Sequence, residues 1–183
     1  REEVYGQIQR MNDIVSYQLS RAARSGHALY SAPIGILPHA ESIVSSLEKI
    51  YRSKGVLCEF EIDPKSQFSG ELGDLQELLG NFLENAFKWA RQRVLLTVRP
   101  LYEPAAKRPG LFLCIEDDGT GIAPEDISKI LQRGVRGDER VQGHGIGMAI
   151  VQDIIQSYGG QLAVDRSAEL GGARFTITLP CLS

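Results

Sequence analysis

The segment from Glu71 to Ala90 has the apolar spacing of a long helix, and it constrains the fold more than any other feature of the sequence. At about 100° of rotation per residue, one helical face carries Leu75, Leu78, Leu79, Phe82, Leu83, Ala86 and Ala90. Two apolar segments with the pattern of strands follow it, from Arg93 to Leu101 and from Leu111 to Glu116. A helix with one apolar face must bury that face, and a sheet built from these strands supplies the surface.

Further patterns extend the sheet and add helices. Strands are predicted at Val56–Ile62, Gln161–Asp165 and Ala173–Leu179, with a short one at Gln67–Ser69, and helices are predicted over Ile146–Tyr158 and from about Ile43 to Arg52. Helices and strands do not alternate strictly, so a parallel sheet of β-α-β units is disfavoured. The predicted class is α+β: a two-layer α/β sandwich with a mixed, mostly antiparallel sheet of about five strands on three helices, preceded by one long helix.

The first residues have the spacing of a helix that packs on other helices. Val4, Ile8, Met11, Val15, Gln18 and Ala22 alternate steps of four and three residues. One helix cannot bury such a seam alone, so it packs either on the following domain or on partner helices, and we expect partner helices outside this chain. The predicted organisation is a partial helical bundle at 1–26, a linker at 27–35 and a second domain at 36–183.

Composition excludes several classes of protein. The net charge of −3 and the pI of 5.7 predict no general attraction for nucleic acid. The apolar runs are too short to span a bilayer. Cys58, Cys114 and Cys181 lack metal-ligand spacing and are predicted to be free thiols.

Three polar residues form a column on the helix predicted at 71–90. Asn81, Asn85 and Lys88 are spaced i, i+4 and i+7, on a stripe roughly opposite the apolar face. Amide oxygens are ligands for a hard divalent cation, and a lysine offers a point charge to phosphate. A solvated helix face has the same pattern, so the column alone leaves both interpretations open.

Acidic residues and glycines follow the strand that ends near Glu116. In the sequence Asp117-Asp118-Gly119-Thr120-Gly121, a carboxylate at the strand end can accept a hydrogen bond from the amino group of a base, while bare backbone approaches the ring. An ordinary hairpin turn has similar composition.

A second glycine-rich run, Gly143-His144-Gly145-Ile146-Gly147, opens the last predicted helix. Its free N–H groups and the helix dipole suit a phosphate. The loop before it carries basic residues, namely Lys129, Arg133, Arg136 and Arg140, as expected of a flexible lid over a triphosphate. The run lacks the strand and acidic residue of a dinucleotide-binding fingerprint, and no P-loop motif is present.

In this order the three motifs resemble the ATP-binding catalytic domain of sensor histidine kinases, which has the Bergerat (GHKL) fold. Residues 81–85 resemble its N box, 117–121 its G1 box and 143–147 its G2 box, and the resemblance covers about residues 34 to 179. The stretches 14–22, 132–136 and 170–174 are similar to a magnesium-sensing subgroup of these kinases. The chain departs from the family at Ile130-Leu131, where a phenylalanine is usual, and at His144.

The resemblance implies a role for each matching residue. Asp117 would hold the adenine amino group, with Trp89 against the purine. Asn85 would bind Mg²⁺ with the help of Asn81. The remaining ATP-binding residues implied are Lys88, Gly119, Gly121, Ile122, Arg136, Arg140, Gly143, His144, Gly145, Ile146 and Gly147, with a lid at about 122–144.

The resemblance also implies partners and a location. The γ-phosphoryl of ATP would pass to a histidine on an upstream helix and then to an aspartate of a response regulator receiver domain. Because His27, His39 and His144 lack the sequence context of that histidine, we expect Mg-ATP binding without autophosphorylation of this chain. The full protein would be a homodimer through its helical bundle and a bacterial inner-membrane sensor, of which this is a cytoplasmic part; membrane segments would lie outside the chain.

Two alternatives remain open. Related ATPases and ATP-gated clamps place a glutamate general base where this chain has Asn81, and a carboxamide cannot take a proton from water. The other alternative is a non-enzymatic scaffold with a vestigial nucleotide pocket.

Overall fold

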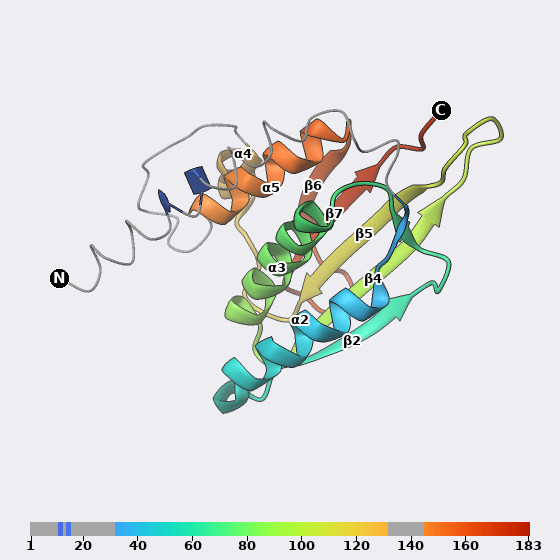
Figure 1. Cartoon of the computed structure of the whole chain (residues 1–183). Coiled ribbons are helices and arrows are strands. Elements are labelled where there is room, and N and C mark those ends of the chain that lie inside the picture. Colours follow the sequence, from blue (N-terminus) through green and yellow to red (C-terminus); the bar gives the residue numbers. More distant parts are fainter. Residues whose placement is uncertain (1–10, 13, 16–31, 132–144) are drawn as a thin grey trace.

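The computed structural model, which describes residues 11–12, 14–15, 32–131 and 145–183, is a two-layer sandwich. Its sheet has five strands in the order β2-β4-β5-β7-β6 (Figure 1). The strands are β2 (Leu57–Ile62), β4 (Arg93–Leu101), β5 (Gly110–Asp117), β6 (Gln161–Arg166) and β7 (Ala173–Leu179). Strand β2 is parallel to β4, and the other neighbours are antiparallel, which confirms the predicted mixed, mostly antiparallel sheet.

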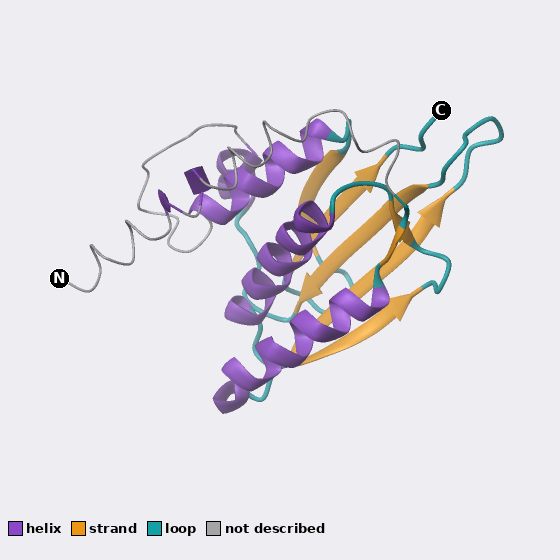
Figure 2. Ribbon diagram, viewed as in Figure 1, coloured by secondary structure: helices purple, strands orange, loops and turns teal. Residues whose placement is uncertain are grey.

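Helices α2 (Leu37–Ile50), α3 (Leu72–Trp89) and α5 (Gly145–Ser157) cover one face of the sheet (Figure 2). Every apolar residue predicted for the inner face of α3 is buried, and Phe87 adds a further ring to the same core. Because α3 lies between α2 and α5 and also contacts β5, it is the central element of the helical layer.

Four smaller elements complete the described part of the fold. Two-residue strands, β1 (Ile34–Gly35) and β3 (Gln67–Phe68), pair with each other apart from the main sheet. Helix η1 (Arg52–Lys54) connects α2 to β2. Helix α4 (Pro124–Leu131) was not predicted, because a charged eight-residue segment beside glycines carries little periodicity. Its end is joined to α5 by the Gln152 side chain, which donates to the carbonyl of Ile130 at 2.7 Å.

A hydrogen-bonded tyrosine holds the end of α5 against the start of α3. The hydroxyl of Tyr158 donates to Oδ2 of Asp74 at 2.6 Å and accepts from the N–H of Glu71 at 3.2 Å. Burial, and then the hydrogen bond to Asp74, raise the pKa of the Tyr158 phenol. The relative position of the two helices is therefore fixed at this end by polar contacts as well as by packing.

The N-terminal predictions are only partly covered by the structure. Residues 11–12 and 14–15 are helical, whereas the rest of the helix predicted at 1–26 and most of the linker at 27–35 lie outside the described residues. Pro38 lies in the first turn of α2, where a missing N–H costs nothing. Within the described ranges, no helix has both the length and the hydrophobicity to cross a membrane. The three cysteines are free thiols, as predicted.

Candidate functional site

The candidate site follows one face of α3. Asn81, Asn85 and Trp89 are spaced by four residues, so their side chains lie in a row about 12 Å long. The two asparagines are half-buried and Trp89 is 40 % exposed. The prediction that the asparagine column faces away from the core was therefore wrong in part: it flanks the core and is partly covered by neighbouring elements.

One end of this row contacts the start of α5. A Cβ atom placed on Gly147 would overlap Oδ1 of Asn81. The amide of Asn81 is oriented by its own helix, because Nδ2 donates to the carbonyl of Glu77 at 2.8 Å and to its Oε2 at 2.9 Å. The predicted N box and the end of the predicted G2 box thus lie against each other, across 66 residues of sequence.

The middle of the row has an unpartnered buried oxygen. Oδ1 of Asn85 has no hydrogen-bond partner within the described part of the chain, although it is shielded from solvent. A buried acceptor without a partner costs free energy, so its persistence is a signal of a ligand.

The other end of the row contacts the tip of β5. A Cβ atom on Gly119 would overlap the carbonyl oxygen of Trp89 and would come within 3.0 Å of Oδ1 of Asp117. The three predicted motifs therefore meet along α3, with Asn85 one turn from each end of the row.

Asp117, the one carboxylate among the predicted site residues, is buried, at 2 % exposure. Its Oδ1 accepts hydrogen bonds from the N–H groups of Gly119 at 2.9 Å and Ala173 at 3.3 Å. Burial raises the pKa of Asp117, while these two N–H groups oppose the shift. Both hydrogen bonds recorded for this carboxylate in the described residues go to Oδ1.

Asp118 has a structural role at the same strand tip. Its carboxylate accepts from the N–H of Arg91 at 2.7 Å and from that of Gln92 at 3.1 Å. Hydrogen bonding from the backbone lowers the pKa of Asp118 despite its partial burial. The adjacent carboxylates thus differ in function: Asp118 anchors the connection between α3 and β4, and Asp117 faces the core side of the sheet.

Two lysines lie at the C-terminal end of α3. Lys54, which the sequence reasoning missed, donates from Nζ to the carbonyls of Phe87 at 3.0 Å and Lys88 at 2.8 Å, so it caps α3. Its charge also opposes the upward shift in the pKa of Asp117. The exposed side chain of Lys88 places Nζ 5.6 Å from the centroid of the Trp89 ring. In the sequence, the only signal at Lys54 is the glycine that follows it, Gly55, which predicts the end of a helix.

Of the remaining predicted site residues, some lie in the described part of the chain and others lie outside it. Gly121 has a φ of +78°, which a residue with a side chain rarely adopts, and Ile122 packs against the core. Gly145 and Ile146 form the first turn of α5. Arg136, Arg140, Gly143 and His144 lie outside the described residues, as does most of the predicted lid.

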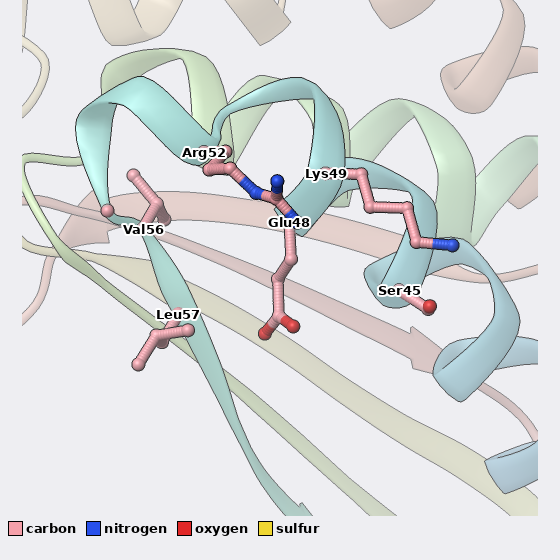
Figure 3. Close-up of a pocket in the computed structure, with 7 residues that line it drawn as sticks. Ser45, Glu48, Lys49, Arg52, Val56 and Leu57 are labelled. Carbon is pink, nitrogen blue, oxygen red and sulfur yellow. The ribbon is translucent and has the colours of Figure 1, made fainter.

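A separate hollow of about 320 Å³ lies between the end of α2 and the start of β2 (Figure 3). Its lining consists of Ser45, Glu48, Lys49, Arg52, Gly55, Val56 and Leu57. The Glu48 side chain extends from α2 toward β2, where Oε1 accepts from the N–H of Cys58 at 3.3 Å. Burial and the nearby Glu48 and Glu59 carboxylates raise the pKa of the Cys58 thiol to about 12. This hollow contains none of the predicted site residues.

Comparisons with known proteins agree with the site. Residues 70–183 match the family described as "Histidine kinase-, DNA gyrase B-, and HSP90-like ATPase". The chain is 40 % identical over 182 residues to the two-component sensor PhoQ of Pseudomonas aeruginosa, covering 97 % of this chain and 39 % of that protein. It is 34 % identical over 172 residues to the sensor protein PhoQ of Escherichia coli K12, covering 93 % of this chain and 34 % of that protein. The chain thus spans between a third and two fifths of these relatives.

Solved structures of similar fold are also histidine kinases. The mycobacterial sensor histidine kinase MprB superposes with a TM-score of 0.63 at 26 % identity, over 82 % of this chain and 99 % of that one. Full-length ShkA in complex with AMPPNP superposes with a TM-score of 0.66 at 26 % identity, over 83 % of this chain and 31 % of that one. These likenesses confirm the predicted Bergerat fold, and the two PhoQ relatives confirm the resemblance to PhoQ sensor kinases. The chain belongs to the family of histidine kinase-, DNA gyrase B- and HSP90-like ATPases, with PhoQ sensor histidine kinases among its relatives.

Proposed function

We propose that this chain binds Mg-ATP along the row Asn81–Asn85–Trp89 and serves as the catalytic domain of a PhoQ-like sensor histidine kinase. The observation that carries the proposal is the meeting of Gly147 and Gly119 with opposite ends of that row. A row of about 12 Å is long enough to take a nucleotide lengthwise, with the base near the β5 tip and the phosphates near α5.

The base end is the buried carboxylate of Asp117. An ionised carboxylate is an acceptor only, so it suits the 6-amino group of adenine. Trp89, on the same side of α3, offers an exposed aromatic surface to the purine. Gly119 and Gly121 keep the backbone bare where the ring would approach.

Mg²⁺ fits the donor set at the middle of the row. In the described ranges, no group of three His, Cys, Asp or Glu residues could hold a metal ion, so a metal here would rely on amide and phosphate oxygens. Oδ1 of Asn85 is the unpartnered oxygen that such an ion requires, and Asn81 lies one turn away. When bound, Mg²⁺ neutralises charge on the phosphates in the transition state.

The phosphate end combines the helix start and basic side chains. The free N–H groups at the start of α5, which includes Gly145, Ile146 and Gly147, suit phosphate oxygens. Lys88, which the sequence also predicts to contact phosphate, lies instead at the base end of the row, with Nζ 5.6 Å from the centroid of the Trp89 ring, so this orientation of the nucleotide does not place it among the phosphate ligands. Arg136, Arg140, Gly143 and His144 complete the proposed set within the lid at about 122–144.

The proposed reaction passes the γ-phosphoryl to a histidine of an upstream helix. A nitrogen of the neutral imidazole attacks phosphorus, the bond to the bridging oxygen breaks, and ADP leaves; the imidazole proton passes to solvent. The phosphoryl then moves to an aspartate of a response regulator receiver domain. The full protein is proposed to dimerise through its helical bundle, which includes residues 1–26, and to be anchored in the inner membrane by other segments.

Asn81 separates this proposal from the ATPase alternative. Its amide already donates twice to Glu77 and has no basic atom to accept a proton from water. We therefore expect nucleotide binding by this chain with little turnover of ATP.

Titration with a non-hydrolysable ATP analogue, with and without Mg²⁺, tests the proposal. We expect Mg²⁺-dependent binding that Asp117→Ala and Asn85→Ala each weaken by about tenfold or more, which corresponds to about 1.4 kcal/mol. Asp63→Ala, at a turn remote from the row, is the matched control and should bind like the parent. Absence of binding by the folded parent would support a vestigial scaffold, and sustained release of phosphate would support an ATPase.

A further inference from the structure

A buried polar pair lies behind Asp117, on the side of the sheet away from the helices. Oγ of Ser167 donates to Oε1 of Glu116 at 2.8 Å, and both residues are buried, with exposures of 2 % and 7 %. Neither belongs to the row along α3. Polar groups so deeply buried cost free energy unless they are hydrogen-bonded, and here they bond to each other.

The same hydroxyl organises the turn between β6 and β7. Oγ of Ser167 accepts from the N–H of Leu170 at 2.9 Å. The turn is closed by two backbone bonds: the N–H of Ser167 donates to the carbonyl of Gly172 at 2.8 Å, and the N–H of Gly171 donates to the carbonyl of Ser167 at 2.9 Å. Ser167 therefore ties this turn to β5 through Glu116.

The far side of the turn contacts Asp117. The N–H of Gly172 donates to the carbonyl of Asp117 at 3.0 Å, and the N–H of Ala173 donates to its Oδ1. A Cβ atom on Gly172 would overlap both oxygens and would come within 2.6 Å of the nitrogen of Gly119. The turn is thus in direct contact with the carboxylate and leaves it no room to rotate in that direction.

We infer that Glu116 and Ser167 are positioning residues for recognition of the base. They hold the turn so that Ala173 engages Oδ1 of Asp117, which directs the other carboxylate oxygen toward the 6-amino group of adenine. The pair sets the preference for a 6-aminopurine nucleotide over a 6-oxopurine nucleotide. This inference rests on the proposed function.

A purely structural role makes a different prediction. If Ser167 only stabilised the fold, its loss would lower the binding affinity for all nucleotides by the same factor. If it positions Asp117, its loss affects only the ligand that donates to Asp117, because a 6-oxo group offers that carboxylate an acceptor in place of a donor.

The test compares the affinities of ATP and ITP, each with Mg²⁺, in the parent and in Ser167→Ala. We expect the parent to prefer ATP by tenfold or more. In Ser167→Ala, the ATP affinity should fall about fivefold to tenfold while the ITP affinity changes less than twofold. Ser167→Thr, which keeps the hydroxyl, should restore the preference.

Two further variants keep the test decisive. Ser157→Ala removes a serine hydrogen bond, to the carbonyl of Ile154, outside this pair and should leave the ATP/ITP ratio unchanged. Should Ser167→Ala fail to fold, Glu116→Gln is the second variant: it keeps the size of the side chain but replaces the carboxylate acceptor of the Ser167 hydroxyl with a weaker, neutral amide oxygen, and it should lower the same ratio by less than Ser167→Ala.

The outcomes separate the two proposals. A parent that binds no ATP overturns the proposed function together with this inference. A parent that prefers ATP, with a ratio that neither Ser167→Ala nor Glu116→Gln changes, overturns only the positioning role. If Ser167→Ala lowers the affinities for ATP and ITP by the same factor, the positioning role is likewise overturned while the proposed function stands.

Discussion

Gly147 of α5 lies so close to Asn81 of α3 that only a residue without a side chain fits there beside the carboxamide. This contact joins two of the sequence motifs and fixes how closely the start of α5 approaches the row along α3. Asn81 cannot easily turn away, because its amide donates twice to Glu77.

Gly147→Ala is therefore expected to weaken Mg-ATP binding by about tenfold and to destabilise the fold by about 1–3 kcal/mol through overpacking. The matched control is Gly80→Ala in α3, where an added Cβ meets nothing within 4 Å. That substitution should stabilise the fold by about 0.5–1 kcal/mol through helix propensity. Urea unfolding and nucleotide titration of both variants measure these effects; equal stabilisation by both would show that the contact is not tight.

Asn85→Ala should separate stability from ligand binding. The substitution removes a buried oxygen that lacks a partner among the described residues, so the free energy of unfolding without ligand should change by less than about 1 kcal/mol. Mg-dependent ATP binding should nevertheless weaken by about tenfold or more.

The comparison for this variant is Asn81→Ala, which breaks two hydrogen bonds to Glu77 and should cost about 1–2 kcal/mol of stability. Calorimetric melting without ligand distinguishes the two. A larger loss of stability in Asn85→Ala than in Asn81→Ala contradicts the assignment of a ligand to Asn85.

Asp117 predicts opposite effects of pH on stability and on binding. Burial raises its pKa in the folded state, so the folded protein favours the protonated form, and this contribution to stability is lost as the pH rises through the folded pKa. Asp117→Asn should therefore unfold at a higher temperature than the parent at neutral pH.

Binding needs the ionised carboxylate as acceptor. The ATP affinity of the parent should fall as the pH decreases through the raised pKa of Asp117, above the ordinary aspartate value of 3.8. Asp117→Asn should bind ATP weakly at every pH. Titrations across a pH series measure this, and a pH-independent affinity in the parent would exclude Asp117 as the base-binding group.

Asp118→Ala should destabilise the fold by about 1–2 kcal/mol, because it leaves the N–H groups of Arg91 and Gln92 without their acceptor. The pKa of Asp118 is lowered on folding, so its contribution is present above the unfolded-state pKa and is lost as the pH falls through the folded one. The difference between parent and variant should accordingly shrink in acid.

Asp126→Ala is the control for this prediction, since Asp126 forms an exposed pair with Lys129 at 3.7 Å and should contribute less than about 0.5 kcal/mol. Urea unfolding at neutral and acidic pH measures both variants. If the two variants lost similar amounts of unfolding free energy, the role of Asp118 in anchoring the connection between α3 and β4 would be contradicted.

Tyr158→Phe should cost about 1–3 kcal/mol, because it removes the phenolic donor to Asp74, a carboxylate that is only 8 % exposed. Tyr102→Phe, at a tyrosine that is 68 % exposed, is the matched control and should leave the melting temperature unchanged. Thermal unfolding of the two variants decides whether this hydrogen bond holds α5 to α3.

Much of the fold was predictable because it rests on local patterns. The apolar face of α3 and the bounds of β4 and β7 follow from periodicities of 3.6 and 2 residues, which depend only on neighbours along the chain. Dependence on local patterns also explains why α4 was not predicted: a short, charged helix has too few apolar positions to reveal its period.

The sequence alone determined which residues we propose to bear chemistry: the amide column, the carboxylate at a strand end and the glycines that open a helix. Only the tertiary structure decided that Asn81 meets Gly147, that Gly119 meets Trp89, and that Ser167 supports Asp117 through a turn 50 residues away. Such contacts join segments far apart in the chain, and their geometry depends on how whole helices and strands pack together.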